Sequence, residues 1–198
     1  RERNDVLPEH NMGMYTVPQI LTNKAEEFLS LAEQLAGYGY HEVNLNLGCP
    51  SGTVVARNRG AGFLGTPREL EAFLDEVFGK CPLEISIKTR IGMDYPDEWT
   101  PLLQIYRKFP MKELIIHPRL QKEGYKGTPH LEAFAEAAEA LQCPLCYNGD
   151  ITSPKTLSQI LAKLPMIDTV MIGRGILQNP GLLQQLKAAS ADSEGGSL

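Results

Sequence analysis

The chain has 198 residues, of which 42% are hydrophobic and 22% charged, as in ordinary globular proteins. Its formal net charge of −5 argues weakly against a nucleic-acid partner, because proteins that bind polyanions usually carry a basic surface. No apolar run approaches the ~18 residues of a membrane span. The unevenly spaced Cys49, Cys81, Cys143 and Cys146 do not resemble a disulfide framework. We therefore expect a cytoplasmic protein with no membrane segment.

Six short β-rich runs alternate with helical patterns along the chain. The predicted strands are residues 16–21, 42–47, 84–89, 113–117, 144–148 and 169–173. The predicted helices are residues 23–38, 66–78, 98–108, 131–141 and 153–164, with a last one after Pro180 through Ala188. Thr66, Pro67 and Glu69 predict a capping residue, a first-turn proline and a first-turn acid at the start of the second helix.

The alternation repeats at about 30 residues, the size of a βαβ unit, and predicts a parallel sheet. Functional residue types collect where predicted strands end, as at Lys88, His117, Asn148 and Arg174. This asymmetry is typical of the catalytic face of a (β/α) barrel, which needs eight strands and usually about 250 residues. The sequence therefore predicts an α/β fold of the (β/α)8 TIM-barrel type, incomplete, with about six of eight strands present.

The predicted organisation has three parts. Residues 1–15 form a polar leader or a remnant of missing strands, residues 16–188 a partial TIM barrel, and residues 189–198 a disordered tail. Because the chain starts at Arg1 rather than at methionine, we expect its natural beginning to be absent. Cations near predicted strand ends, such as Arg57 and Lys126, would suit a phosphate-bearing ligand, or they are solvated loop charges.

Cys49 follows the predicted strand 42–47 and precedes the glycine-rich stretch from Arg59 to Gly62. A thiol at the carboxyl end of a parallel strand could act as an acid, a base or a nucleophile. The same position also suits a buried structural cysteine, and the local pattern does not separate the two interpretations. Cys143 and Cys146 have the spacing of a redox CxxC motif, but they lead into a predicted strand, whereas a redox CxxC normally opens a helix. A zinc site would need two more ligands, and none lies nearby in the sequence. We expect no metal site.

Six segments, taken in chain order, resemble the tRNA-dihydrouridine synthase family over residues 16 to about 183. They are Gln19, Asn46-Leu47-Gly48-Cys49-Pro50, Lys88-Thr89-Arg90-Ile91-Gly92, His117-Pro118-Arg119, Asn148-Gly149-Asp150 and Gly173-Arg174-Gly175. Pro118 replaces the small residue that the family carries between the histidine and the arginine. The family's first two strands and its carboxyl-terminal helical domain, which helps to hold the tRNA, have no counterpart.

The resemblance implies an enzyme that uses FMN, with NADPH as reductant, to reduce a uridine of tRNA to 5,6-dihydrouridine. Reduced FMN would give a hydride to C6 of the base, and Cys49 would protonate C5 from the opposite face. It also implies which residues bind each partner. The expected cofactor contacts are Gln19, Lys88, His117, Asn148, Gly149, Asp150, Gly173 and Arg174, and the expected substrate contacts are Asn46, Arg90 and Arg119.

Several alternatives stay open at this point. The chain could be another FMN barrel of the dihydroorotate or dihydropyrimidine dehydrogenase type, although those enzymes usually separate the serine or cysteine from its proline, whereas Cys49 adjoins Pro50. It could also be a truncated barrel that binds RNA or protein without catalysis. Asn46 could be a satisfied strand-end residue, Lys88 could reach solvent, and His117 could be a packed histidine.

Overall fold

The computed structural model describes residues 2–194, and it describes side chains for residues 4–189. Its centre is a curved sheet of six parallel strands in the sequential order β1-β2-β3-β4-β5-β6. The strands are β1 (Gln19–Ile20), β2 (Glu42–Leu47), β3 (Glu84–Arg90), β4 (Leu114–His117), β5 (Leu145–Asn148) and β6 (Thr169–Met171). Each strand pairs with the next along the chain, which is barrel winding and confirms the predicted fold class of an incomplete TIM barrel.

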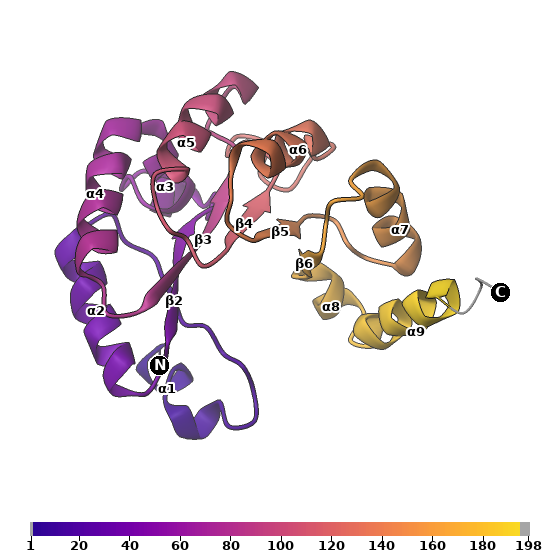
Figure 1. Cartoon of the computed structure of the whole chain (residues 1–198), viewed down its shortest axis with the longest axis horizontal. Helices are drawn as coiled ribbons and strands as arrows, with labels where there is room; N and C mark the ends of the chain where they lie inside the picture. Colours follow the sequence, from indigo (N-terminus) through magenta and orange to yellow (C-terminus); the bar gives the residue numbers. More distant parts are fainter. Residues whose placement is uncertain (1, 195–198) are drawn as a thin grey trace.

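Helices connect the strands and cover the outer side of the curved sheet (Figure 1). The longer ones are α2 (Ala25–Gly37), α4 (Pro67–Lys80), α5 (Trp99–Tyr106), α6 (Leu131–Ala140), α7 (Pro154–Lys163) and α9 (Leu182–Glu194). The short ones are α1 (Glu2–Asp5), α3 (Gly52–Val55) and α8 (Arg174–Gln178), with 3₁₀ turns η1 (Pro8–His10), η2 (Gly60–Gly65) and η3 (Pro96–Glu98). None of the described helices is long and apolar enough to cross a bilayer.

The core lies between the sheet and these helices, because strands of parallel sheets are buried on both faces. Phe73 of α4 makes edge-on ring contacts with Phe28 of α2, at 6.0 Å between centroids, and with Phe63 of η2, at 5.4 Å. Trp99 at the start of α5 is buried, and its indole N–H donates to the carbonyl of Ala133 in α6 at 2.8 Å. These contacts join neighbouring helices on the outer side of the sheet.

The sheet register aligns the carboxyl ends of the strands at one edge. Asn46 of β2 pairs with Lys88 of β3, and Arg90 of β3 pairs with His117 of β4. Asn148 ends β5 beside Met171 of β6. Residues that are far apart in sequence are thereby brought to one rim, as expected for a parallel barrel.

Several details differ from the sequence-based expectations. The predicted strand at 16–21 forms a strand only over Gln19–Ile20. The hydroxyl of Thr66 does not cap α4: it donates to the carbonyl of Phe63 and exchanges hydrogen bonds with Asn58, whose amide also donates to Glu69. The predicted strand at 169–173 ends at Met171, because α8 starts at Arg174. Helix α9 continues to Glu194, inside the predicted disordered tail, and residues 195–198 lie outside the described part of the chain.

Candidate active site

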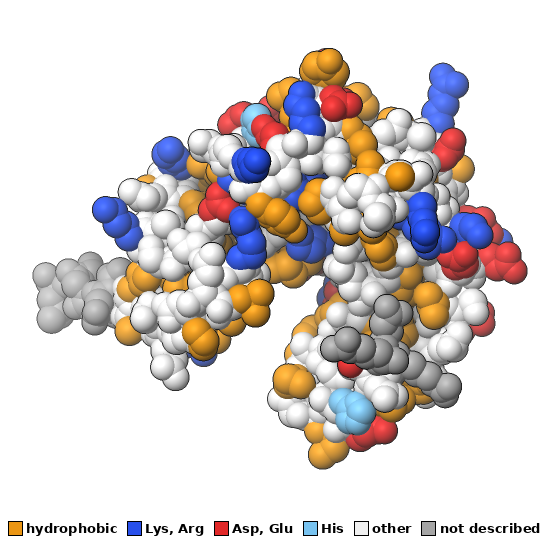
Figure 2. Space-filling model, turned by 180° about the vertical axis from the view of Figure 1, so that it is seen from behind, with side chains coloured by type: hydrophobic (Ala, Val, Ile, Leu, Met, Phe, Trp, Pro, Cys, Tyr) orange, Lys and Arg blue, Asp and Glu red, His pale blue; other side chains and the backbone are white. Residues whose placement is uncertain are grey.

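A pocket of about 700 Å³ opens at the carboxyl ends of the strands. Its size lies within the range of small-molecule sites. Figure 2 shows the surface hollowed between the carboxyl-terminal helices and the amino-terminal segment, with Lys and Arg side chains above the hollow. The pocket brings together eleven of the twelve predicted site residues, namely Gln19, Asn46, Cys49, Lys88, Arg90, His117, Asn148, Gly149, Asp150, Gly173 and Arg174.

The Cys49 thiol is half-buried and lies on the wall of this pocket, not beneath the core. Asn46 holds the turn that carries it, because the backbone N–H groups of Gly48 and Cys49 both donate to Asn46 Oδ1, at 3.0 and 2.9 Å. Only the oxygen of an amide can accept two N–H donors, so these bonds fix the orientation of the Asn46 side chain. Its Nδ2 donates to Gln19 Oε1 at 2.7 Å, which leaves one amide hydrogen for a ligand.

A chain of amide contacts continues from Asn46 across the inner face of the sheet. Gln19 Nε2 donates to Asn44 Oδ1 at 2.8 Å, and Asn44 Nδ2 donates to the hydroxyl of Ser86 at 2.9 Å. Asn44 and Ser86 are buried, so their hydrogen bonds avoid the penalty of unpaired polar groups. Gln19 is thus both a pocket residue and a support for Asn46.

The glycine-rich stretch after Cys49 packs directly on that residue. A Cβ placed on Gly60 would lie 2.9 Å from the Cys49 carbonyl oxygen and 3.0 Å from the Cys49 Cβ. Gly60 also has a φ of +56°, a left-handed conformation that favours glycine. The N–H of Ala61 then donates to the Cys49 carbonyl at 3.0 Å, which closes the turn.

Substitution Gly60→Ala is expected to destabilise the protein by about 2 kcal/mol, because a left-handed alanine and a clash with backbone atoms add together. Urea denaturation measures this change. Gly79→Ala in α4 is the matched control, since a Cβ there meets nothing within 4 Å, and its stability should be equal to or above that of the unsubstituted protein. Equal stabilities for both variants would contradict the packing argument.

Lys88 projects into the pocket from β3 and is half-buried. Burial, and secondarily the positive charge of Arg90, lowers the pKa of Lys88 to about 8, so the side chain is mostly a cation at neutral pH. Cys146 of β5 lies near it but is buried, and burial raises the pKa of this thiol to about 12. Cys146 therefore stays protonated and is a poor nucleophile.

Arg90 lines the pocket, and its guanidinium also hydrogen-bonds to backbone carbonyls within the protein. The side chain is 1% exposed, and its Nε donates to the Gly48 carbonyl at 2.9 Å while Nη1 donates to the Leu120 carbonyl at 3.0 Å. It thus ties the cysteine turn to the loop that follows β4. Tyr125 of that loop covers the guanidinium, with 5.3 Å between Arg90 Cζ and the ring centroid.

Tyr125 is the centre of an aromatic and cationic cluster at the rim. Its ring stacks on His117, at 6.1 Å between centroids and 27° between planes. The guanidinium of Arg174 lies over the same ring, at 4.4 Å from its centroid. The sequence alone does not place Tyr125 in the pocket, because nothing in it reveals how this loop folds back over the strand ends.

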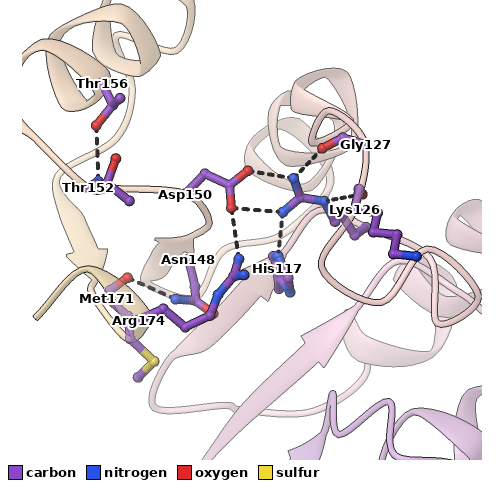
Figure 3. A network of polar contacts seen from close by, with 10 residues as sticks. His117, Lys126, Gly127, Asn148, Asp150, Thr152, Thr156, Met171 and Arg174 are labelled. Atoms are coloured by element: carbon purple, nitrogen blue, oxygen red, sulfur yellow. Dashed lines mark hydrogen bonds and ion pairs between the residues drawn. The ribbon is translucent and has the colours of Figure 1, made fainter. Parts of the chain in front are cut away.

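Arg119 is the one predicted site residue that does not line the pocket. It is 1% exposed, and its guanidinium hydrogen-bonds inside the protein, to His117, Asp150 and the carbonyls of Lys126 and Gly127 (Figure 3). These contacts leave it no hydrogen for a ligand, in contrast to its expected role as a substrate contact.

Asp150 joins Arg119 to Arg174, whose Nη2 lies 3.0 Å from Asp150 Oδ1. Burial opposes ionisation of Asp150, but the hydrogen bond and charge of Arg119, together with Arg174, hold the pKa of this carboxyl below its usual value. Arg174 is half-exposed and lines the pocket. Thr152 and Thr156, which sequence reasoning missed, also line the pocket just after Asp150, and the Thr152 N–H donates to the Thr156 hydroxyl at 3.1 Å.

The remaining candidate chemistry is limited. Within residues 4–189, no group of three or more His, Cys, Asp or Glu side chains is placed to hold a metal ion. Cys143 lies just before β5 and Cys146 within it, so this pair leads into a strand as expected. The pocket therefore offers one thiol, one lysine and several hydrogen-bonding side chains.

The family described as dihydrouridine synthase (Dus) matches residues 2–196, nearly the whole chain. The chain belongs to this family. Three relatives illustrate the similarity. Probable tRNA-dihydrouridine synthases of Staphylococcus aureus and Staphylococcus epidermidis are 36% and 35% identical over 178 and 170 residues, covering 87% and 83% of this chain. The tRNA-dihydrouridine(16) synthase of Aquipseudomonas alcaligenes is 30% identical over 154 residues, or 77% of this chain.

The matched regions are 52%, 51% and 49% of the lengths of these three relatives, so the chain spans about half of each. Membership of the dihydrouridine synthase family thus rests on a barrel segment. That segment contains the pocket and each of the six motifs from Gln19 to Gly175.

Proposed function

We propose that this protein reduces a uridine of tRNA to 5,6-dihydrouridine, using FMN as cofactor and NADPH as reductant, with Cys49 as the acid. The observation that carries the proposal is the position of the Cys49 thiol in one pocket with Lys88 and with the strand-end segments at Asn148 and Gly173. The family match and the names of the relatives support the same reaction.

The residues present fit FMN. The pocket has the volume of a small-molecule site, and Lys88, Arg90 and Arg174 supply positive charge for a phosphate and an electron-rich ring. A Cβ on Gly173 would meet nothing within 4 Å, so the backbone there is open to a ligand. We assign the phosphate to the side of Gly173 and Arg174 and the polar ring edge to Gln19 and Lys88.

FMN, when bound, supplies the hydride for the base. Cys49, on the wall of the same pocket, would supply the proton that C5 of the uridine requires, as a positioned general acid. Asn46 fixes the backbone on which this thiol stands and offers its remaining amide hydrogen to the base. Lys88 supplies a positive charge beside the ring, where negative charge accumulates during the reaction.

The test begins with purified protein titrated with FMN, followed by incubation with NADPH and tRNA that lacks modifications. We expect a yellow protein with stoichiometric FMN and the appearance of dihydrouridine, identified by mass spectrometry of the nucleosides. A colourless protein that does not bind added FMN would contradict the proposal and favour a non-catalytic binding module. Reduction of free orotate or uracil, but not of tRNA, would favour another FMN barrel.

A further inference from the structure

We propose that Arg119 is a positioning residue that fixes His117 as a neutral imidazole with its proton on Nδ1, so that His117 meets the bound ligand as a hydrogen-bond donor. The tautomer follows from contacts within the protein. The identity of the ligand as FMN rests on the proposed function above, and the experiments below separate the two.

Every N–H of the Arg119 guanidinium has an acceptor inside the protein. Nε donates to the Lys126 carbonyl at 3.0 Å, Nη1 to His117 Nε2 at 3.1 Å and to Asp150 Oδ1 at 3.2 Å, and Nη2 to Asp150 Oδ2 and the Gly127 carbonyl. Since arginine has five donors and no acceptor, this set is complete. Figure 3 shows these partners together: His117 ends β4, Lys126 and Gly127 lie in the loop after it, and Asp150 follows β5.

The contact with His117 determines where the imidazole proton sits. Arginine can only donate, so His117 Nε2 must be the acceptor of its 3.1 Å hydrogen bond. A neutral imidazole whose Nε2 accepts carries its proton on Nδ1. A protonated ring would place two donors against each other in a side chain that is only 4% exposed.

The charges around His117 also favour the neutral form. Lys88 and Arg90 face it from β3, Arg119 from its own loop and Asp150 from the segment after β5, while the ring of Tyr125 stacks on it. Burial acts first, and the three cations outweigh the single carboxylate, so together they lower the pKa of His117 to about 3. Geometry and charge thus agree on a neutral ring across the whole physiological pH range.

This arrangement sets a chemical requirement on the ligand. His117 lines the pocket and can offer only the Nδ1 hydrogen, so the ligand atom that it contacts has to be an acceptor, such as a carbonyl or phosphate oxygen or an unprotonated ring nitrogen. A donor at the same place would leave two hydrogens opposed, which buried sites reject strongly. Arg119 thereby acts on ligand choice without contacting the ligand.

The tautomer can be measured in the ligand-free protein by long-range ¹H–¹⁵N NMR correlations after labelling its four histidines, with His117→Gln to assign the signal. We expect the Nδ1–H pattern for His117, unchanged between pH 5 and pH 8. We expect Arg119→Met, which has no N–H to donate to His117 Nε2, to give an Nε2–H signal or a mixture of the two tautomers. A wild-type signal of the Nε2–H or the protonated form overturns the proposal, whether or not the variant folds.

The consequence for the ligand is measured separately, by FMN titration of the same proteins. We expect Arg119→Met to weaken FMN binding at least tenfold. Arg107→Met is the control, because Arg107 is exposed and contacts Gln104, and it should leave FMN binding unchanged. An altered tautomer with unchanged FMN affinity would overturn the ligand half of the proposal. Absence of FMN binding by the wild-type protein would instead refute the proposed function, and the NMR result would still decide the tautomer.

Discussion

Substitution Cys49→Ala is expected to reduce dihydrouridine formation at least 100-fold, the usual contribution of a positioned acid. The thiol lies on the pocket wall, and no other cysteine lines that pocket. Alanine keeps the Cys49 backbone N–H that Asn46 holds, so the turn and the packing of Gly60 should persist. FMN affinity and NADPH oxidation should therefore remain close to the wild-type values, and the loss should be confined to the step that involves the base.

Cys81→Ala is the matched control, because this half-buried thiol follows α4 and takes no part in the pocket. It should keep full dihydrouridine formation. Alkylation of the wild-type protein should reproduce the loss seen in Cys49→Ala and should have no effect on that variant. Full activity of Cys49→Ala would remove the thiol from the mechanism, and loss of FMN binding would show that the residue supports the pocket rather than the chemistry.

The positions of the strand-end residues could be predicted from sequence, because the strand pattern and the residue that follows each strand are both local features. Residues 42–47 form β2 at the predicted bounds, and Cys49 follows at the end of the strand where parallel sheets carry function. Sequential winding then brings Lys88, His117 and Asn148 to the same rim without any knowledge of side-chain contacts. For these residues, order along the chain is enough to place them together.

The partners of polar side chains could not be predicted in this way. The sequence pattern predicts Thr66 as a helix cap, but its hydroxyl hydrogen-bonds to Asn58 and to the Phe63 carbonyl. Arg119 has the position of a ligand contact, yet its acceptors include Asp150, which is 31 residues away in sequence. Such pairings depend on loop conformations, which periodicity and spacing do not encode. Short helices such as α8 could not be predicted from the sequence for the same reason.

A second large effect is expected at Asp150, whose carboxylate is the counter-ion of the buried Arg119. Asp150→Asn removes the charge but keeps one acceptor, and asparagine tolerates the left-handed φ of +47° found there. Loss of one partner leaves Arg119 charged at 1% exposure, and we expect a destabilisation of roughly 3 kcal/mol, at the lower end for buried ion pairs because Asp150 is itself 39% exposed.

A double-mutant cycle with Arg119→Met isolates this coupling. Each single variant leaves an unpaired group, whereas the double variant removes both charges, so its loss in the free energy of unfolding should be smaller than the sum of the two single losses by more than 1 kcal/mol. Urea denaturation at neutral pH measures all three, with Asp97→Asn, an exposed carboxyl outside the network, as the control. Strict additivity would mean that Arg119 is held by the Lys126 and Gly127 carbonyls alone. The ion pair would then have no part in positioning His117.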